Sequence, residues 1–306
     1  MRKHSSLFAW LQLLRLPNVF TAVADVLMGY LVVHRGELLS IENLIVLAAV
    51  SILLYLSGMA LNDVFDAEVD ARDCPDRPIP SGRVSLKAAT AVGWGMLTAG
   101  VTLAWILSFT VNYWPPGVVA TLLAACILLY DGALKRTRLA PLIMGECRML
   151  NVLLGMSVMI VPWGKAEILI AFGIGVYIMG VTIFARTDAR ISTRTRLTSG
   201  LIVLLSGIAL LTAVPWLTAE RPPLAVSLPG WYLLWAALAL IIGRRCTMAV
   251  FEPSPKRVQT AVRNCVHSII VLDAAVCVGY ASPYWGFAVL SLLIPTMLLT
   301  LWLNAT

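Results

Sequence analysis

Apolar runs long enough to cross a bilayer recur along almost the whole of this sequence, and they constrain its fold more than any other feature. A helix needs about 20 apolar residues to span the hydrocarbon core of a membrane. Here 59% of all residues are apolar and 13% are charged. The sequence therefore predicts one domain over residues 1–306, an all-α polytopic transmembrane helix bundle of nine to ten helices. The runs lie at 16–34, 41–62, 87–110, 114–130, 139–162, 166–185, 197–218, 228–248, 262–281 and 284–303.

The basic residues predict how the chain is oriented. The formal net charge is +7, and lysines and arginines gather in the short cytoplasmic loops of membrane proteins. If the N-terminus is cytoplasmic, nearly all of them fall on that side, and only Arg35, Lys165 and Arg221 fall on the other. We therefore expect a multi-pass integral membrane protein with its N-terminus and its polar motifs at the cytoplasmic face. Basic clusters confined to such loops argue against a nucleic-acid partner.

An acidic segment follows the second apolar run directly. On a continuous helix, at about 100° per residue, Asn62, Asp63, Asp66 and Asp70 share one face, so three carboxylates converge. Such carboxylates repel one another unless a cation holds them together. Mg²⁺ suits the site because it typically bridges one or two carboxylates to substrate phosphates. The alternative is a solvated acidic helix end that only marks the end of a membrane span.

The next loop favours the phosphate interpretation. Arg72, Arg77 and Arg83 stand on a turn that contains Pro78 and Pro80. Guanidinium groups are suited to bidentate contacts with phosphate. Cations beside a metal site predict a pocket for a diphosphate group.

These motifs resemble those of a known family. The pattern N-D-x-x-D-x-x-x-D at 62–70, followed by R-P-I-x-x-G-x-x-S at 77–85, resembles the first aspartate-rich motif of the UbiA superfamily of intramembrane prenyltransferases. Two further motifs support the resemblance, Arg15-x-Pro17-Asn18 and the run 130–136 (Y-D-G-A-L-K-R). The resemblance covers roughly residues 10–281. The last apolar run is therefore an addition to the nine helices that are usual in the family. Further motifs look most like the EboC-like bacterial branch, which implies a bacterial inner membrane.

The resemblance implies an activity and a site. It implies that Mg²⁺, held by two aspartate motifs, binds the diphosphate of a prenyl donor. The metal ligands would be Asn62, Asp63, Asp66, Asp70 and Asp188. The donor or cofactor would be bound by Arg15, Asn18, Arg77, Arg136, Arg148 and Asn151. The catalytic residues would be Asp66, Asp70, Lys135 and Tyr130. The ring of Tyr130 would face a carbocation. Without the motif, an equally good interpretation is that Tyr130 is a tyrosine at the membrane interface.

The second aspartate motif departs from the family pattern. The family usually has D-x-x-x-D, but here Asp188 is followed four residues later by Ser192. We therefore expect a single tightly held Mg²⁺, with Arg186 or Arg190 supplying charge at the diphosphate. The alternative is that both arginines are ordinary cytoplasmic loop charges.

Several polar residues lie inside predicted spans, where an uncompensated charge costs at least about 2.5 kcal/mol. Asp25, Arg148 and Asn151 should therefore face a cavity or one another. We expect Arg148 and Asn151 to line the acceptor or diphosphate cavity, although a purely structural polar network remains the alternative. Asp273 could pair with His267 or with a neighbouring helix.

Together these features predict a Mg²⁺-dependent enzyme that transfers an isoprenoid chain from a prenyl diphosphate to a small acceptor of unknown identity within the lipid bilayer. The main alternative is a catalytically divergent protein of the same fold that binds or transports a lipid or isoprenoid. A phosphoalcohol transferase is disfavoured, because the D-G-x-x-A-R motif and the paired-aspartate spacing of that class are absent at Asp131-Gly132.

Overall fold

The computed structural model describes residues 6–159, 162–186, 194–217 and 225–305, and these residues form helices without any strand. The first half contains α1 (Ser6–Leu13), η1 (Leu16–Asn18), α2 (Val19–Val33), α3 (Ile41–Phe65), α4 (Ala67–Asp73), α5 (Leu86–Thr110), α6 (Pro115–Leu129), η2 (Tyr130–Leu134) and α7 (Ala140–Gly155). The second half contains α8 (Lys165–Ala185), α9 (Arg194–Leu217), α10 (Leu228–Phe251), α11 (Pro255–Tyr280), α12 (Pro283–Leu290) and α13 (Leu293–Ala305).

The prediction of an all-α polytopic membrane bundle is confirmed. In the described part of the chain, nine helical segments are long and apolar enough to cross a membrane. The remaining predicted span, 139–162, is the shorter helix α7, which ends at Gly155 because the chain turns at Met156–Ser157. The last predicted span is formed by α12 and α13 in succession.

Polar residues just outside the spans start several of these helices. Ser40 accepts a hydrogen bond from the Asn43 amide at the start of α3, and Ser85 accepts one from the Ala88 amide at the start of α5. Each serine satisfies one of the amide donors that a helix N-terminus leaves without a partner.

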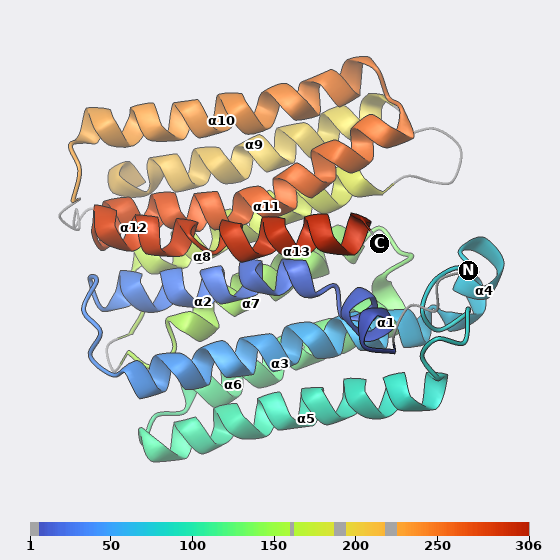
Figure 1. The fold of residues 1–306 in the computed structure, drawn as a ribbon. Helices are drawn as coiled ribbons and strands as arrows, with labels where there is room; N and C mark the ends of the chain where they lie inside the picture. The colour runs from blue at the N-terminus through green and yellow to red at the C-terminus, as the bar shows by residue number, and fades with distance from the viewer. Residues whose placement is uncertain (1–5, 160–161, 187–193, 218–224, 306) are drawn as a thin grey trace.

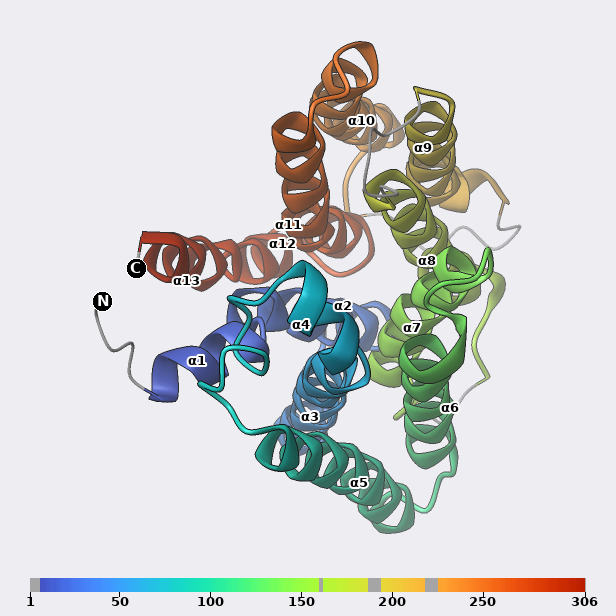
Figure 2. The same ribbon diagram turned by 90° about the vertical axis from the view of Figure 1, so that its right-hand side faces the viewer.

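Helix α2 lies in the middle of the bundle. Figures 1 and 2 show α3, α5, α6 and α7 on one side of it and α8 to α11 on the other, and α2 contacts α3, α7 and α11 directly. Glycines bring α2 close to α7: a Cβ atom added at Gly29 would lie 2.5 Å from the carbonyl oxygen of Val152. Small residues allow such close approach of membrane helices, and here the approach sets polar residues of α2 against those of α7.

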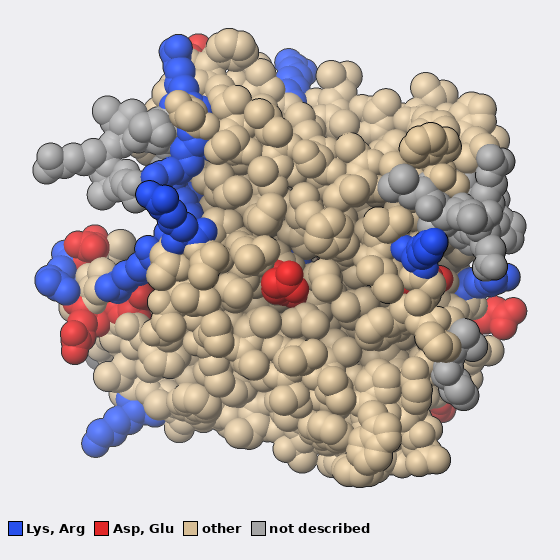
Figure 3. Space-filling view, turned by 180° about the vertical axis from the view of Figure 1, so that it is seen from behind, with Lys and Arg blue, Asp and Glu red and all other residues tan. Residues whose placement is uncertain are grey.

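One end of the bundle carries most of its charge. The segments that follow α3, α6 and α10 lie at this end, together with α1 and α4 (Figure 1). On the face seen in Figure 3, lysines and arginines gather near one end, and a broad surface with a single acidic patch separates them from a smaller charged group at the opposite end. The structure thus brings together the described parts of the loops that the sequence assigns to the cytoplasm. The orientation itself stays a prediction.

Candidate functional site

A pocket of about 400 Å³ opens between α2, α3, α6, η2 and α7. Its charged end is lined by Arg15, Asn62, Asp66, Asp70, Arg77, Asp131 and Lys135. Its deep end is lined by Ser51, Arg148 and Asn151, and Ser51 lies about 16 Å from Asn62 along α3 at 1.5 Å per residue. Between the two ends the walls are largely apolar, formed by Leu54, Gly58, Met59, Leu123, Ile127 and Met144. The pocket can therefore hold a ligand that has both a charged and an apolar part.

The acidic segment forms a junction between two helices, so the prediction of one continuous helix through Asp70 is wrong in this detail. Helix α3 ends at Phe65, Asp66 is a turn residue, and α4 begins at Ala67. Backbone hydrogen bonds still cross the junction, from the Asp66 amide to Asn62 and from the Asp70 amide to Asp66. For this reason Asn62, Asp66 and Asp70 all line the pocket, whereas Asp63 is not among its lining residues.

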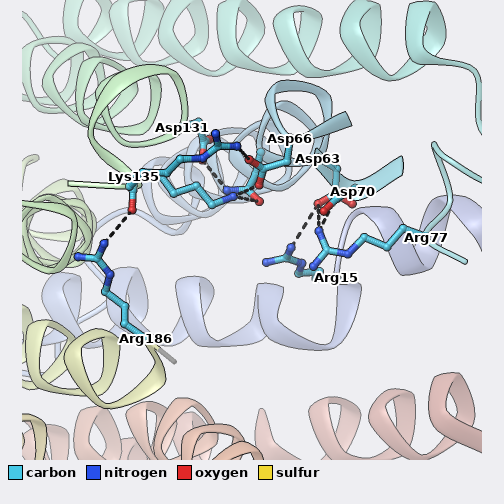
Figure 4. Close-up of polar contacts among 10 residues, drawn as sticks. Arg15, Asp63, Asp66, Asp70, Arg77, Asp131, Lys135 and Arg186 are labelled. Carbon is cyan, nitrogen blue, oxygen red and sulfur yellow. Dashed lines mark hydrogen bonds and ion pairs between the residues drawn. The ribbon is translucent and has the colours of Figure 1, made fainter. Parts of the chain in front are cut away.

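Each of the three aspartates of this segment contacts a cation (Figure 4). Lys135 contacts Asp66, and Arg136 lies 3.6 Å from the same carboxylate. Arg77 contacts Asp70 at 2.6 Å. The structure therefore places Lys135, Arg136 and Arg77, which the sequence predicted as diphosphate ligands, beside the aspartates that it predicted as metal ligands.

Arg15 and Arg77 both approach Asp63. Arg15 Nη2 lies 3.3 Å from Asp63 Oδ1, and Arg77 Nη1 lies 3.9 Å from the same oxygen. Arg15 has a left-handed backbone with φ of 45°, which is uncommon for a residue other than glycine. Burial would lower the pKa of Arg77, but its hydrogen bond and charge contact with Asp70 raise that pKa overall. Arg77 therefore stays cationic.

Asp131 belongs to the same cluster, although we did not predict it as a site residue. The side-chain nitrogen Nδ2 of Asn62 donates a hydrogen bond of 2.6 Å to Asp131 Oδ1, and Asn62 Oδ1 accepts one of 3.0 Å from Lys135 Nζ. The π-helical turn η2 and the residue after it place Tyr130, Asp131 and Lys135 on the wall of the pocket. The hydrogen bond of this turn runs from the backbone amide of Lys135 to the carbonyl oxygen of Tyr130. The motif at 130–136 contained Asp131 and could have identified it.

The donor set fits a hard divalent cation. No group of three or more His, Cys, Asp or Glu side chains among the described residues is arranged to hold a metal by itself. The pocket nevertheless presents Asn62, Asp66 and Asp70 as oxygen donors, and Mg²⁺ needs only one or two carboxylates when water and phosphate complete its coordination. The cations that now contact these carboxylates are partly exposed, so they can move toward an incoming phosphate.

Arg186 and Asn18, two further predicted residues, do not line this pocket. Arg186 donates to the carbonyl oxygens of Thr137, at 2.6 Å, and Lys135, at 3.4 Å, so it supports the loop that carries Lys135 (Figure 4). Asn18 borders a neighbouring cavity together with Arg15, and its role stays a prediction. Asp188 and Arg190 lie outside the described residues.

Fold and site together define a multi-pass helical membrane protein with an acidic and basic cluster at one end of an apolar pocket. The family model of the UbiA prenyltransferase family matches residues 22–251. The chain belongs to this family, as the sequence motifs predicted. The narrower resemblance to the EboC-like branch stays a prediction.

The chain is similar to digeranylgeranylglyceryl phosphate synthases of archaea. It is 34% identical to that of Metallosphaera sedula over 128 residues, which cover 42% of this chain and 43% of the relative. It is 34% identical to that of Methanopyrus kandleri over 152 residues, covering 48% and 53%. The matches thus span about half of the length of these curated relatives.

Solved structures show the same fold. A structure of digeranylgeranylglyceryl phosphate synthase has a TM-score of 0.63 and 21% identity, covering 90% of this chain and 98% of that one. A UbiA homologue from Archaeoglobus fulgidus bound to GPP and Mg²⁺ has a TM-score of 0.59 and 15% identity, covering 92% and 99%.

Proposed function

We propose that this protein transfers an isoprenoid chain from a prenyl diphosphate to a small acceptor within the membrane, in a Mg²⁺-dependent reaction. The observation that carries the proposal is the pocket, which joins paired carboxylates and cations at one end to apolar walls. Such a pocket matches a molecule with an anionic head and an apolar tail. Membership of the UbiA prenyltransferase family and the homologue bound to GPP and Mg²⁺ support it.

We infer that donor binding exchanges the partners of the charged residues. Asn62, Asp66 and Asp70 would hold the metal ion, with Asp63 behind them and Asp188 as a further ligand. Lys135, Arg77 and Arg136, released from the carboxylates, would then bind the diphosphate. Arg15 would keep Asp63 neutralised, because it pairs with that residue at 3.3 Å.

The chemistry of the proposed reaction is the departure of diphosphate from an allylic carbon. Bound Mg²⁺ would withdraw charge from the leaving group. Lys135 and Arg77 stabilise the same charge by direct contact, more strongly as the bond breaks. Tyr130, at the charged end of the pocket, can present its ring to the carbocation. The apolar walls formed by Leu54, Gly58, Leu123 and Ile127 hold the tail and exclude water.

We further propose that residues 1–306 act as one domain with a cytoplasmic N-terminus and a cytoplasmic opening of the pocket, in a bacterial inner membrane. The basic loops at the charged end support this orientation. Labelling of single cysteines placed at Arg83 and at Arg35 in intact cells tests it. The residue at position 83 should react only after the membrane is permeabilised.

The number of metal ions is a separate part of the proposal. Because Ser192 stands where the family usually has a second aspartate, we expect one tightly held Mg²⁺, with Arg186 or Arg190 close to the diphosphate. A titration with Mn²⁺ as a spectroscopic probe, in the presence of a non-hydrolysable prenyl diphosphate, measures the stoichiometry. Two tightly bound ions would contradict this expectation.

Incubation of the purified protein with labelled prenyl diphosphates of several lengths, Mg²⁺ and a lipid-free cell extract tests the activity. We expect a labelled lipid product that depends on Mg²⁺. Binding of donor without any product would favour a lipid-binding or transport function instead.

A further inference from the structure

The deep end of the pocket is a buried polar network that joins α2, α3 and α7. Arg148 donates to Asp25 Oδ2 at 2.7 Å and to the hydroxyl of Thr21 at 2.6 Å. Asn151 donates to the same Asp25 oxygen at 2.9 Å and accepts a hydrogen bond of 2.7 Å from Ser51. Asp25 is fully buried and the Arg148 side chain is 13% exposed. The positive charge of Arg148 is therefore already neutralised before any ligand enters.

A second carboxyl group lies beside this pair. Asp273, on α11, is fully buried next to Asp25 and also lies near Arg148. Neither oxygen of Asp273 nor Oδ1 of Asp25 has a hydrogen-bond partner among the described residues. Two ionised carboxylates with one guanidinium would leave a net negative charge inside the membrane, which is costly. One proton held between Asp25 and Asp273 would remove that charge and would give the unpartnered oxygens a hydrogen bond.

The two walls of the pocket differ in chemistry. On α3 and α6, Leu54, Gly58, Leu123 and Ile127 form an apolar wall suited to an isoprenoid chain. On α7, Arg148 and Asn151 form a polar wall. If the proposed transfer is correct, the donor tail lies along the first wall, and the second wall is left for the acceptor.

We propose that this polar wall selects an uncharged, hydroxyl-bearing acceptor, contacted by Arg148 and Asn151. Asp25 and Asp273 act as positioning residues that keep Arg148 in place and electrically neutral. A hydroxyl group can accept from Arg148 and donate to the oxygen of Ser51 or Asn151. A carboxylate or phosphate can only accept hydrogen bonds, and it would be repelled by Asp25 without meeting an unpaired positive charge. The inference rests on the proposed prenyl transfer and names its acceptor class.

The test separates acceptors by charge. Small molecules from a lipid-free cell extract are passed over an anion-exchange resin, and the flow-through and the retained anions are each incubated with the purified protein, Mg²⁺ and labelled geranyl diphosphate. Donor binding is measured beforehand by thermal stabilisation. We expect at least about tenfold more labelled lipid from the uncharged fraction, the equivalent of one ionic contact. Product formed mainly from the anionic fraction would overturn the inference alone. Absence of donor binding, or of product from both fractions, would overturn the proposed transfer together with it.

A variant tests the positioning role. Asp25→Asn combined with Asp273→Asn leaves the charge of Arg148 unmatched, so the yield from the anionic fraction should rise about tenfold relative to the uncharged fraction. The control is Glu146→Gln, the same carboxyl-to-amide change on α7 at a residue that does not line the pocket. It should keep the wild-type ratio. A folded double variant with the wild-type ratio would exclude this role for the two aspartates. If that variant does not fold, the fraction experiment on the wild-type protein still decides the inference.

Discussion

The charged end and the deep end of the pocket use the same pairing of carboxylates with basic side chains, but they differ in burial. At the charged end the side chains of Lys135, Arg77 and Arg136 are 27%, 39% and 68% exposed. At the deep end Asp25 is fully buried and its partner Arg148 is nearly so. Exposed ion pairs contribute about 0 to 1 kcal/mol, whereas breaking a buried pair costs about 3 to 5 kcal/mol. The first set can exchange partners with a ligand, and the second is held in place.

The largest effect is expected at the charged end, from Asp66→Ala. Because Asp66 lies on the pocket and is a proposed metal ligand, its loss should lower turnover at least 10²- to 10³-fold, the range of about 2.7 to 4 kcal/mol seen when a preorganised electrostatic contact is removed. Product formation from a labelled prenyl diphosphate measures this. Glu68→Ala, at an exposed carboxylate of α4, is the matched control. Normal turnover of the Asp66 variant in saturating Mg²⁺ would show that the site assignment is wrong.

At the deep end, Arg148→Met should chiefly affect folding. Removing the guanidinium leaves Asp25 buried without its cation, so we expect a loss of about 3 to 5 kcal/mol in the free energy of unfolding. Thermal or denaturant unfolding in detergent measures it without any substrate. The comparison fails if this variant is as stable as Arg136→Met, a change at the most exposed cation of the charged end.

A smaller effect is expected from Lys135→Met and Arg77→Met. Each removes one charged hydrogen-bonding group, worth about 1.5 to 3 kcal/mol, which corresponds to roughly a ten- to hundredfold decrease in kcat/KM. Donor affinity and rate should fall together, because the contact exists in the ground state and strengthens in the transition state. Unchanged kinetics in both variants would remove these residues from the site.

The smallest effect is expected from Asp273→Asn. If Asp273 carries the shared proton, the amide replaces a neutral group of similar shape and can donate to Asp25, so the free energy of unfolding should change by less than about 1 kcal/mol. Asp273→Leu, which cannot donate, should be less stable. Equal stability of the Asn and Leu variants would show that no hydrogen bond joins Asp273 to Asp25.

The two ends also differ in how far the sequence predicts them. That Asn62, Asp66 and Asp70 lie on one side of the chain was predictable, because their spacing follows the helical repeat. The turn at Asp66 does not change this, since helical backbone hydrogen bonds continue across it. The nine to ten spans were predictable because long apolar runs have few alternatives to a membrane helix. Asp25 and Arg148 were expected to face a cavity or one another, and in the structure they form an ion pair.

Contacts between distant helices could not be derived in this way. Asp273 approaches Asp25 because α11 packs on α2, and no pattern in either segment specifies that packing. Asp131 reaches Asn62 through the π-helical turn η2, whose extra residue changes the side-chain direction that an α-helix would give. The early end of α7 at Gly155 depends on a local turn rather than on hydropathy.

The junction at Asp66 also has a consequence for dynamics. Asn62 belongs to a well-packed membrane helix, but Asp70 belongs to α4, in which it is the only buried residue. A segment with so few buried contacts opens more readily than the core of the bundle. A ligand that bridges Asn62, Asp66 and Asp70 would therefore fasten a loosely held helix to a rigid one, and the free energy of binding would be partly used to order α4. Amide hydrogen exchange should slow on addition of Mg²⁺ and donor mainly over residues 67–83, while exchange over 41–61 stays as it was.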